Sequence, residues 1–308
     1  MQLYLPIAEM SVDVFVLFLL GGGIGFLSGL FGVGGGFLLT PLLIFVGVPP
    51  AVAVATQANQ VIAASVSGAI SHWRRGNVDI RMGLVLLAGG FVGSSLGVVL
   101  YTVLRAVGQL DLVIALSYVF FLGTVGGLML LESMRVILRK MHANGSSSRR
   151  KLHVHTWIHG LPLKMRFRTS KLYISAIVPF AIGAAVGVLA AILGTGGGFL
   201  MLPAMIYLLG MPTVLAVGTS LFQIVFVAAN VTLLQSIHNQ TVDVFLAFVL
   251  IVGGVIGAPL GSRLAGRLPG EQLRALLALI VFGVSLKLLV DLVRTPADLY
   301  LLLPQVAQ

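Results

Sequence analysis

The sequence predicts an all-α integral membrane protein, with about ten hydrophobic segments in two inverted five-segment repeats. Of its 308 residues, 58% are hydrophobic and 9% are charged, and the mean hydropathy is +1.08. Soluble domains have about a quarter of their residues charged, so this chain belongs in a membrane. Its apolar runs have the length of membrane helices rather than the ~10-residue alternating pattern of outer-membrane strands.

The repeat is the third observation behind this fold class. Residues 32–57 (GVGGGFLLTPLLIFVGVPPAVAVATQ) return, little changed, at residues 194–220 (GTGGGFLMLPAMIYLLGMPTVLAVGTS). Equivalent positions hold a glycine run, a proline, a threonine and an aspartate, namely Gly34, Gly35 and Gly36 with Gly196, Gly197 and Gly198, Pro41 with Pro203, Thr56 with Thr219, and Asp79 with Asp243. Internal repeats in an apolar chain are typical of secondary transporters, which hold their substrate near the bilayer midplane between the copies.

The apolar segments follow one another in two groups of five. The first group is 12–31, 36–47, 51–71, 82–104 and 110–136, and the second is 172–193, 198–210, 213–236, 242–262 and 272–293. We therefore divide the chain into a first membrane repeat (1–138), a basic linker (139–171) and a second membrane repeat (172–308). The linker is polar and rich in Lys and Arg, so we expect it to be cytoplasmic.

An odd number of crossings in each half requires the second half to be inserted upside down. With the N-terminus outside, 16 of the 19 Lys and Arg residues fall on the cytoplasmic side, as the positive-inside rule expects. The alternative treats 36–47 and 198–210 as re-entrant hairpins, which gives parallel repeats. It would place Arg263, Arg267 and Arg274 outside, so we favour inversion.

Segments 36–47 and 198–210 are too short to be ordinary spans. Residues 37–46 make about 15 Å of helix, half of a ~30 Å hydrocarbon core. The glycine run before each segment can cover the remaining depth, because glycine accepts backbone angles that other residues avoid. Each helix then begins near the midplane, with free N–H groups and the positive end of its dipole exposed to the interior, which favours an anion.

Neutral polar residues open the next segment of each half. They are Thr56, Gln57, Asn59 and Gln60 in the first half and Thr219, Ser220 and Gln223 in the second. With Gly34, Gly35, Gly36, Gly196, Gly197 and Gly198 they form the predicted substrate site. These polar groups could instead only hydrogen-bond neighbouring helices, and the sequence leaves that alternative open.

No Asp, Glu, Lys or Arg lies clearly at mid-membrane depth, so the sequence offers no carboxylate proton relay. The membrane potential could drive an anion instead, since it is worth ~2.3 kcal/mol per charge at 100 mV and favours exit from an inside-negative cell. We expect no enzyme activity, no catalytic residue and no cofactor, because neither a nucleophile–base set nor a carboxylate pair appears.

The sequence excludes or disfavours several other types of site. The chain has no Cys, which excludes disulfides and thiolate metal sites. The glycine run lacks the Gly-Lys-Ser/Thr of a phosphate loop, and the positive charge sits in short loops, so we expect no nucleotide or nucleic acid. The linker histidines His153, His155 and His159 could bind a metal ion, but a basic strip on anionic lipid is the favoured reading.

The paired glycine motifs resemble those of the TauE/SafE family of sulfite exporters, also called the toluene-sulfonate uptake permease family. The resemblance covers residues 12–136 and 172–293 and includes Pro41 and Pro203. It implies a multi-pass carrier of the bacterial inner membrane for sulfite, sulfonates or related anions. The linker 139–171 is longer than this family usually carries, so its role does not follow from the resemblance.

The leading expectation is therefore an exporter of a small sulfur-containing oxyanion, working by alternating access at a midplane site. Its expected partners are that anion and membrane lipid, and Gly-x-x-x-Gly ladders leave open a homo-oligomer. One alternative is a proton- or sodium-coupled anion uptake carrier. Another is a membrane sensor or assembly factor that acts through the linker.

Overall fold

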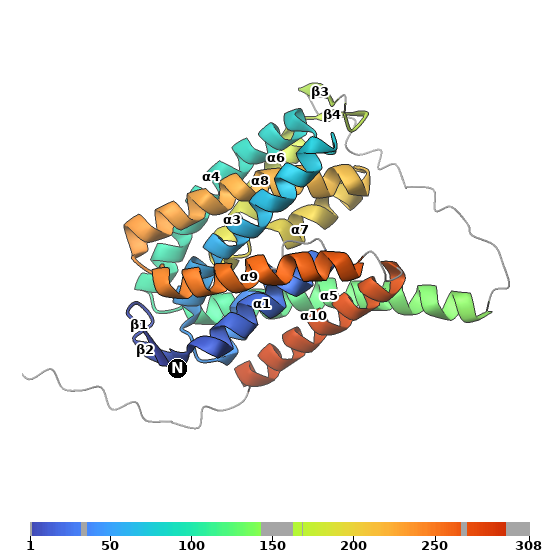
Figure 1. Cartoon of the computed structure of the whole chain (residues 1–308). Coiled ribbons are helices and arrows are strands. Elements are labelled where there is room, and N and C mark those ends of the chain that lie inside the picture. Colours follow the sequence, from blue (N-terminus) through green and yellow to red (C-terminus); the bar gives the residue numbers. More distant parts are fainter. Residues whose placement is uncertain (1, 32–35, 143–162, 168, 266–269, 294–308) are drawn as a thin grey trace, which may run out of the picture.

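The computed structural model describes residues 2–31, 36–142, 163–167, 169–265 and 270–293, and it is predominantly helical (Figure 1). The first half contains α1 (Val14–Phe31), α2 (Gly36–Phe45), α3 (Pro50–Arg74), α4 (Ile80–Ala106) and α5 (Leu110–His142). The second half contains α6 (Ile177–Leu193), α7 (Gly198–Pro203), α8 (Thr213–Leu234), α9 (Val244–Ala265) and α10 (Gly270–Val293). Each predicted segment thus overlaps one of these α-helices.

Prolines and glycines set the helix boundaries between these segments. Helix α3 begins at Pro50, and α8 begins directly after Pro212, since proline suits a position where no backbone N–H is needed. Two short π-helical turns, η2 (Ala204–Leu208) and η3 (Gln235–Asn239), extend α7 and α8. The predicted segment 198–210 is therefore α7 followed by η2.

Two β-hairpins were not predicted. Strands β1 (Gln2–Leu5) and β2 (Met10–Asp13) pair antiparallel before α1, and β3 (Lys164–Phe167) and β4 (Leu172–Ser175) pair antiparallel before α6. Each half therefore starts with a hairpin. The predicted boundary at residue 171 falls inside the second hairpin, and linker residues 143–162 lie outside the described residues.

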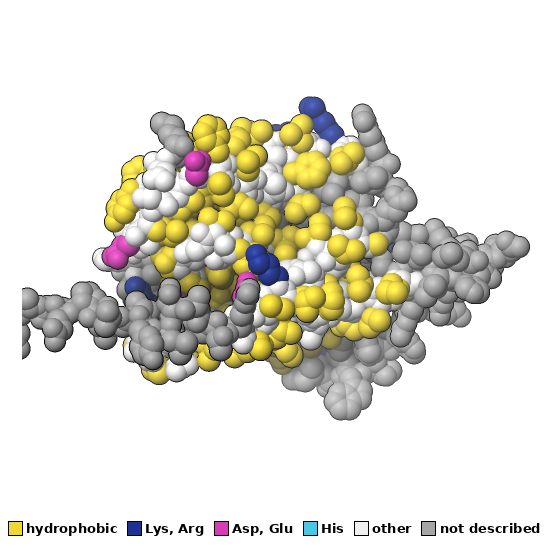
Figure 2. Space-filling view, turned by 90° about the horizontal axis from the view of Figure 1, so that it is seen from below, with side chains coloured by type: hydrophobic (Ala, Val, Ile, Leu, Met, Phe, Trp, Pro, Cys, Tyr) yellow, Lys and Arg dark blue, Asp and Glu magenta, His cyan; other side chains and the backbone are white. Residues whose placement is uncertain are grey.

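The helices suit a multi-pass membrane protein. Five of those described are long and apolar enough to cross a membrane: Ile80–Ala106, Leu110–Leu131, Thr213–Asn239, Val244–Gly261 and Ala275–Val293. Large hydrophobic side chains such as Leu19, Phe120 and Phe248 are two-thirds exposed. Figure 2 shows one face covered mainly by hydrophobic side chains, with few charges among them. Lipid rather than water is the solvent that such a surface requires.

The two halves pack through glycine ladders. Helix α1 runs beside α9 and α6 beside α4. A Cβ on Gly25 would lie 2.4 Å from the carbonyl oxygen of Gly254, and a Cβ on Gly93 would lie 1.9 Å from that of Ala184. Only glycine permits such close backbones, so the interpretation of the Gly-x-x-x-Gly ladders as helix contact faces is confirmed.

Equivalent helices of the two halves cross in opposite directions. On α3 and α8, Val61 clusters with Ile224 and Ala228, whereas Gly68 lies against Leu221. Residue numbers therefore rise along α3 as they fall along α8. Helices α5 and α10 show the same antiparallel relation through contacts near residues 119 and 285 and near residues 126 and 281.

The first prediction compares two glycines on α1. Gly25→Val should lower the free energy of unfolding by about 1–3 kcal/mol, because its Cβ would overlap the backbone of Gly254. Gly23→Val is the matched control, because a Cβ there meets nothing within 4 Å. Thermal unfolding in detergent, followed by size-exclusion chromatography, measures both. Equal melting temperatures would contradict the close α1–α9 contact.

Candidate functional site

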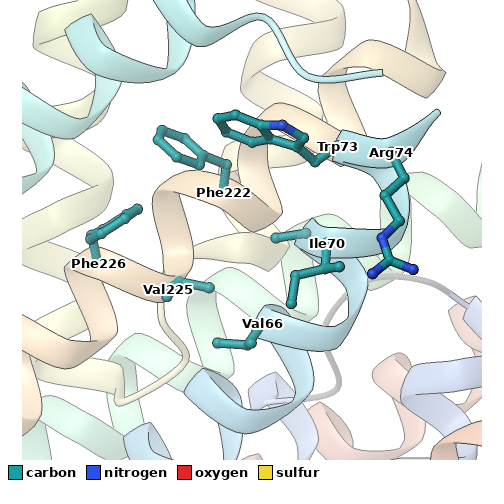
Figure 3. A pocket seen from close by; sticks show the side chains of 8 residues that line it. Val66, Ile70, Trp73, Arg74, Phe222, Val225 and Phe226 are labelled. Atoms are coloured by element: carbon teal, nitrogen blue, oxygen red, sulfur yellow. The ribbon is translucent and has the colours of Figure 1, made fainter. Parts of the chain in front are cut away.

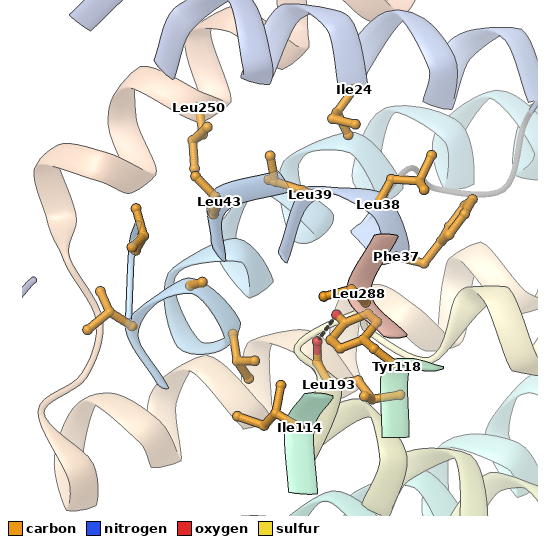
Figure 4. Packing of buried hydrophobic residues seen from close by; sticks show 14 of the residues in the cluster. Ile24, Phe37, Leu38, Leu39, Leu43, Ile114, Tyr118, Leu193, Leu250 and Leu288 are labelled. Carbon is orange, nitrogen blue, oxygen red and sulfur yellow. Dashed lines mark hydrogen bonds between the residues drawn. The ribbon is translucent and has the colours of Figure 1, made fainter. Parts of the chain in front are cut away.

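The first turns of α2 and α7 meet in the interior of the bundle. Phe37 follows Gly36 at the start of α2, and Phe199 follows Gly198 at the start of α7. Their rings stack with centroids 4.5 Å apart and planes at 19°. Both side chains are buried, and Figure 4 shows Phe37 among the packed core residues. The two glycine-led helix starts, 162 positions apart in the sequence, are thus brought together.

The glycine loop before α7 is pressed between α3 and α8. Gly194, Gly196 and Gly197 have φ of +68°, +63° and +77°, which side chains rarely adopt. A Cβ on Gly196 would lie 2.6 Å from a methyl carbon of Val61 and 2.9 Å from one of Ile224. Glycine is therefore required here for both conformation and space. The equivalent Gly34 and Gly35 lie outside the described residues.

Gln57 holds the start of α2 against the second half. Its amide nitrogen donates to the carbonyl of Gly36 and, at 3.2 Å, to the carbonyl of Gly194. Its amide oxygen accepts from the hydroxyl of Thr40. Gln57 is fully buried, and its bond to Gly194 satisfies a carbonyl that the end of α6 leaves open.

A tyrosine completes this support on the side of α6. The hydroxyl of Tyr118, on α5, donates to the carbonyl of Leu193, the last residue of α6 (Figure 4). Tyr118 is fully buried and belongs to the first half, whereas Leu193 belongs to the second. Sequence reasoning missed this residue, because a single Tyr in an apolar helix carries no motif.

Thr56 and Thr219 make reciprocal hydrogen bonds between the halves. The backbone N–H of Asp243 donates to the hydroxyl oxygen of Thr56 at 3.0 Å, and the backbone N–H of Asp79 donates to that of Thr219 at 3.0 Å. Both threonines are fully buried. Neither hydroxyl donates to a described acceptor, so each retains a proton for a further hydrogen bond.

Asp79 and Asp243 join each of these threonines to a helix start and a hairpin. Their Oδ1 atoms accept from the N–H of Met82 at 3.2 Å and of Leu246 at 3.1 Å, which caps α4 and α9. We call these two sites the Asp79 junction and the Asp243 junction. The aspartates were recognised in the sequence as repeat partners, but their structural role was not.

The hairpins supply the remaining partners of the two junctions. Oδ2 of Asp79 accepts from the N–H of Ser170 at 3.0 Å and from the Ser170 hydroxyl, in the turn between β3 and β4. Oδ2 of Asp243 accepts from the N–H of Ile7 at 3.1 Å, in the turn between β1 and β2. Each hairpin therefore binds the aspartate of the opposite half, and the two junctions lie at opposite ends of the α3–α8 pair.

Gln223 stands out because its amide has no partner. It is 1% exposed, and neither its amide nitrogen nor its amide oxygen has a hydrogen-bond partner among the described residues. Leaving such a group unpaired costs about 1–3 kcal/mol. A Cβ added to Gly90 would lie 2.7 Å from the amide nitrogen of Gln223. In the other half, a Cβ added to Gly254 would lie 2.8 Å from the amide nitrogen of Gln60. The two glutamines thus occupy equivalent places in the two halves.

The remaining predicted polar residues are satisfied within their own helices. The amide nitrogen of Asn59 donates to the carbonyl of Thr56 at 3.3 Å, and the hydroxyl of Ser220 donates to the carbonyl of Val217 at 3.0 Å. Asn59 is half-buried and Ser220 is buried. For these two residues the structure shows only bonds within the same helix, and not the bonds to neighbouring helices that the sequence left open as an alternative.

The chemistry at this centre is that of neutral donors. The amide of Gln57, the hydroxyl of Thr40 and glycine backbone lie at the meeting point of α2 and α7. The carboxylates of the two buried aspartates accept from backbone N–H groups at opposite ends of the α3–α8 pair. Across the described parts of the chain, no group of three His, Asp or Glu side chains could hold a metal ion. The linker histidines His153, His155 and His159 lie outside those parts.

Comparison with known proteins gives one family over most of the chain. The model of the family described as sulfite exporter TauE/SafE matches residues 17–288. A "probable membrane transporter protein" of Xylella fastidiosa (strain 9a5c) is 33% identical over 274 residues, covering 86% of this chain and 91% of the relative. Probable membrane transporter protein YjnA of Bacillus subtilis (strain 168) is 30% identical over 283 residues, covering 91% and 100%.

A plant relative matches over a shorter stretch. Sulfite exporter TauE/SafE family protein 5 of Arabidopsis thaliana is 37% identical over 101 residues, which is 33% of this chain and 22% of that protein. No solved structure matches the chain.

The second prediction tests the reciprocal threonine bonds. Thr219→Val keeps the shape of the side chain but removes the acceptor of the Asp79 N–H, so the protein should lose about 1–3 kcal/mol of stability. Thr219→Ser keeps the acceptor and should lose less. Thermal unfolding in detergent distinguishes them, and a Val variant as stable as the Ser variant would show that this bond contributes nothing.

Proposed function

The chain belongs to the sulfite exporter TauE/SafE family of membrane transporters, and on that premise we propose that it exports a small sulfur-containing oxyanion, such as sulfite or an organosulfonate. It is a transporter and not an enzyme. The anion binds in the middle of the bundle, where α2 and α7 begin, and alternating access exposes it first to the cytoplasm and then to the outside.

The unpaired amide of Gln223 is the observation that carries this proposal. In the described part of the chain, several buried side chains have one polar atom without a partner, but only Gln223 has two, and a bound ligand can supply the missing hydrogen bonds. The N–H groups at the starts of α2 and α7 add further donors of the kind an oxyanion accepts. The hydroxyls of Thr56 and Thr219 instead lie at the two ends of the α3–α8 pair, beside the junctions. Gln60, Gly36, Gly196, Gly197 and Gly198 complete the proposed site.

The proposed inverted topology is supported by the directions of equivalent helices. A two-fold axis along the membrane normal would leave equivalent helices parallel, whereas an axis in the membrane plane makes them antiparallel. The antiparallel crossings of α3 with α8 and of α5 with α10 favour the second arrangement. With that arrangement the linker is cytoplasmic and the N-terminus is outside.

The two junctions would serve as gates at opposite ends of the site. The carboxylate of Asp79 accepts three hydrogen bonds, and the carboxylate of Asp243 accepts two. The larger number of hydrogen bonds at Asp79 suits a transporter in which the Asp79 end is held closed more tightly than the Asp243 end. Release of a junction would free a hairpin and a helix start of opposite halves together, so each end can open while the other stays shut.

Charge supports the outward direction. Among the described residues, no Lys, Arg, Asp or Glu lies at the proposed site, since the two buried aspartates lie in the junctions at its ends, so a bound anion would cross uncompensated. An inside-negative potential then favours its exit by ~2.3 kcal/mol per charge at 100 mV.

The third prediction separates binding from structure at Gln223. Gln223→Leu should leave the melting temperature unchanged or higher, because it replaces an unpaired buried amide by an apolar group. The same change should raise the sulfite concentration for half-maximal flux about 10-fold or more, because a hydrogen bond to a charged ligand is lost. Radiolabelled sulfite flux in proteoliposomes, with an imposed potential of either sign, gives the measurement.

Gln57→Leu is the matched control for this experiment. Gln57 holds Gly36 and Gly194, so its loss should lower the melting temperature as well as the flux. Normal flux in a stable Gln223→Leu protein would remove Gln223 from the site. Absence of saturable, potential-dependent flux of any sulfur oxyanion in the unmodified protein would refute the proposed function.

The fourth prediction uses the absence of Cys to follow access from either side. A single reporter, Ser220→Cys, is labelled by a membrane-impermeant maleimide from one side or the other. Adding Asp79→Asn should raise labelling several-fold from the side of the Asp79 junction, and adding Asp243→Asn should raise it from the opposite side. Asp111→Asn is the control. An increase from the same side in both variants would contradict the two-gate account.

A further inference from the structure

A groove on the surface of the bundle lies between α3 and α8, away from the proposed transport site (Figure 3). Its volume is about 400 Å³, and its walls include Val66 and Ile70 from α3 and Val225 and Phe226 from α8. None of the residues assigned to the transport site lines it. The transport function therefore gives no reason for this hollow.

The aromatic side chains of the groove are fixed by packing. The rings of Trp73 and Phe222 lie 5.8 Å apart, and Phe222 meets Phe226 edge to face at 5.2 Å. A Cβ on Gly83 would lie 2.9 Å from the Phe222 ring, so this glycine of α4 makes room for it. The groove is thus preformed rather than a gap between mobile side chains.

One end of the groove is cationic. Arg74 forms part of its wall at the C-terminal end of α3, and Arg75 follows directly. Arg74 makes no ion pair with any side chain in the described part of the chain. The nearest acidic residue along the sequence, Asp79, is 1% exposed and already accepts three hydrogen bonds. The positive charge of the Arg74 guanidinium can therefore pair with an anionic ligand.

An apolar groove with a single cationic end fits a molecule with a hydrocarbon tail and an anionic head. From Val66 to Arg74 the groove follows α3 for about 12 Å. Trp and Arg together at a helix end are typical of the membrane–water interface, where the headgroups of phospholipids lie. Both the lining and its place on the surface between α3 and the apolar helix α8 match a lipid.

We propose that this groove is a binding site for one anionic phospholipid. The phosphate contacts the guanidinium of Arg74, and an acyl chain lies between Val66 and Phe226 beside the ring of Trp73. The net positive charge of Arg74 and Arg75 selects an anionic headgroup over a zwitterionic one. The inference does not depend on the direction or substrate of transport.

Tryptophan fluorescence provides a direct test in the full-length chain. The protein has two tryptophans, and Trp157→Phe leaves Trp73 as the single fluorophore. The protein is reconstituted in phosphatidylcholine that contains a minor fraction of phosphatidylglycerol with brominated acyl chains, which quench a tryptophan on contact. Quenching above the level for the same fraction of brominated phosphatidylcholine measures the preference for the anionic lipid, expected to be about fivefold for one basic contact.

Two variants locate the preference. Arg74→Gln should reduce it to near unity, whereas Arg74→Lys should retain most of it. Arg263→Gln, a matched loss of an exposed arginine at the end of another helix, should leave it unchanged. Val66→Phe fills the groove and should lower quenching by brominated chains of either lipid.

Three results would overturn the proposal. The first is a preference that survives Arg74→Gln. The second is a change in Trp73 fluorescence with soluble glycerol phosphate that equals the change with the lipid, which would show that an anion alone binds. The third is loss of dimers, without change in lipid quenching, on Val66→Phe, which would show that a second copy of the chain covers the groove.

Discussion

Backbone groups inside a membrane must find partners within the protein, and here the two halves supply them to each other. At the end of α6, carbonyls of the second half accept from side chains of the first half. Gln57 of the first half binds the carbonyl of Gly194 in the second, and Tyr118 binds that of Leu193. The junctions at Asp79 and Asp243 then tie each hairpin to a helix start of the opposite half. The proposed central site lies between the two junctions.

Most of the helical fold could be predicted from the sequence because the same signals occur twice. Apolar runs predicted ten segments that each overlap one described α-helix, and the doubled glycine and proline motifs indicated that they form two repeats. The hairpins could not be predicted, because their strands are only four residues long and their turns are held by hydrogen bonds to aspartates far away in the sequence. Antiparallel crossing of equivalent helices is likewise a tertiary property, and the sequence reached inversion only through the distribution of charge.

The predicted site divides into groups that sequence patterns could not separate. Gln57, Thr56 and Thr219 hold backbone groups in place, Asn59 and Ser220 bond within their own helices, and Gln223 is left without a partner. All of these residues look alike in the sequence, as polar positions on an apolar helix. What distinguishes them is which backbone groups of the other half come within reach, and that depends on the complete fold.

Expression of the two halves as separate chains, divided between residues 143 and 162, tests most directly whether each half completes the other. The measurement is sulfite flux in vesicles after co-purification through a tag on one half. Mutual completion predicts that the halves co-purify and recover flux, and that neither half is stable or active alone. A single half that inserts, remains folded and transports sulfite by itself would contradict it.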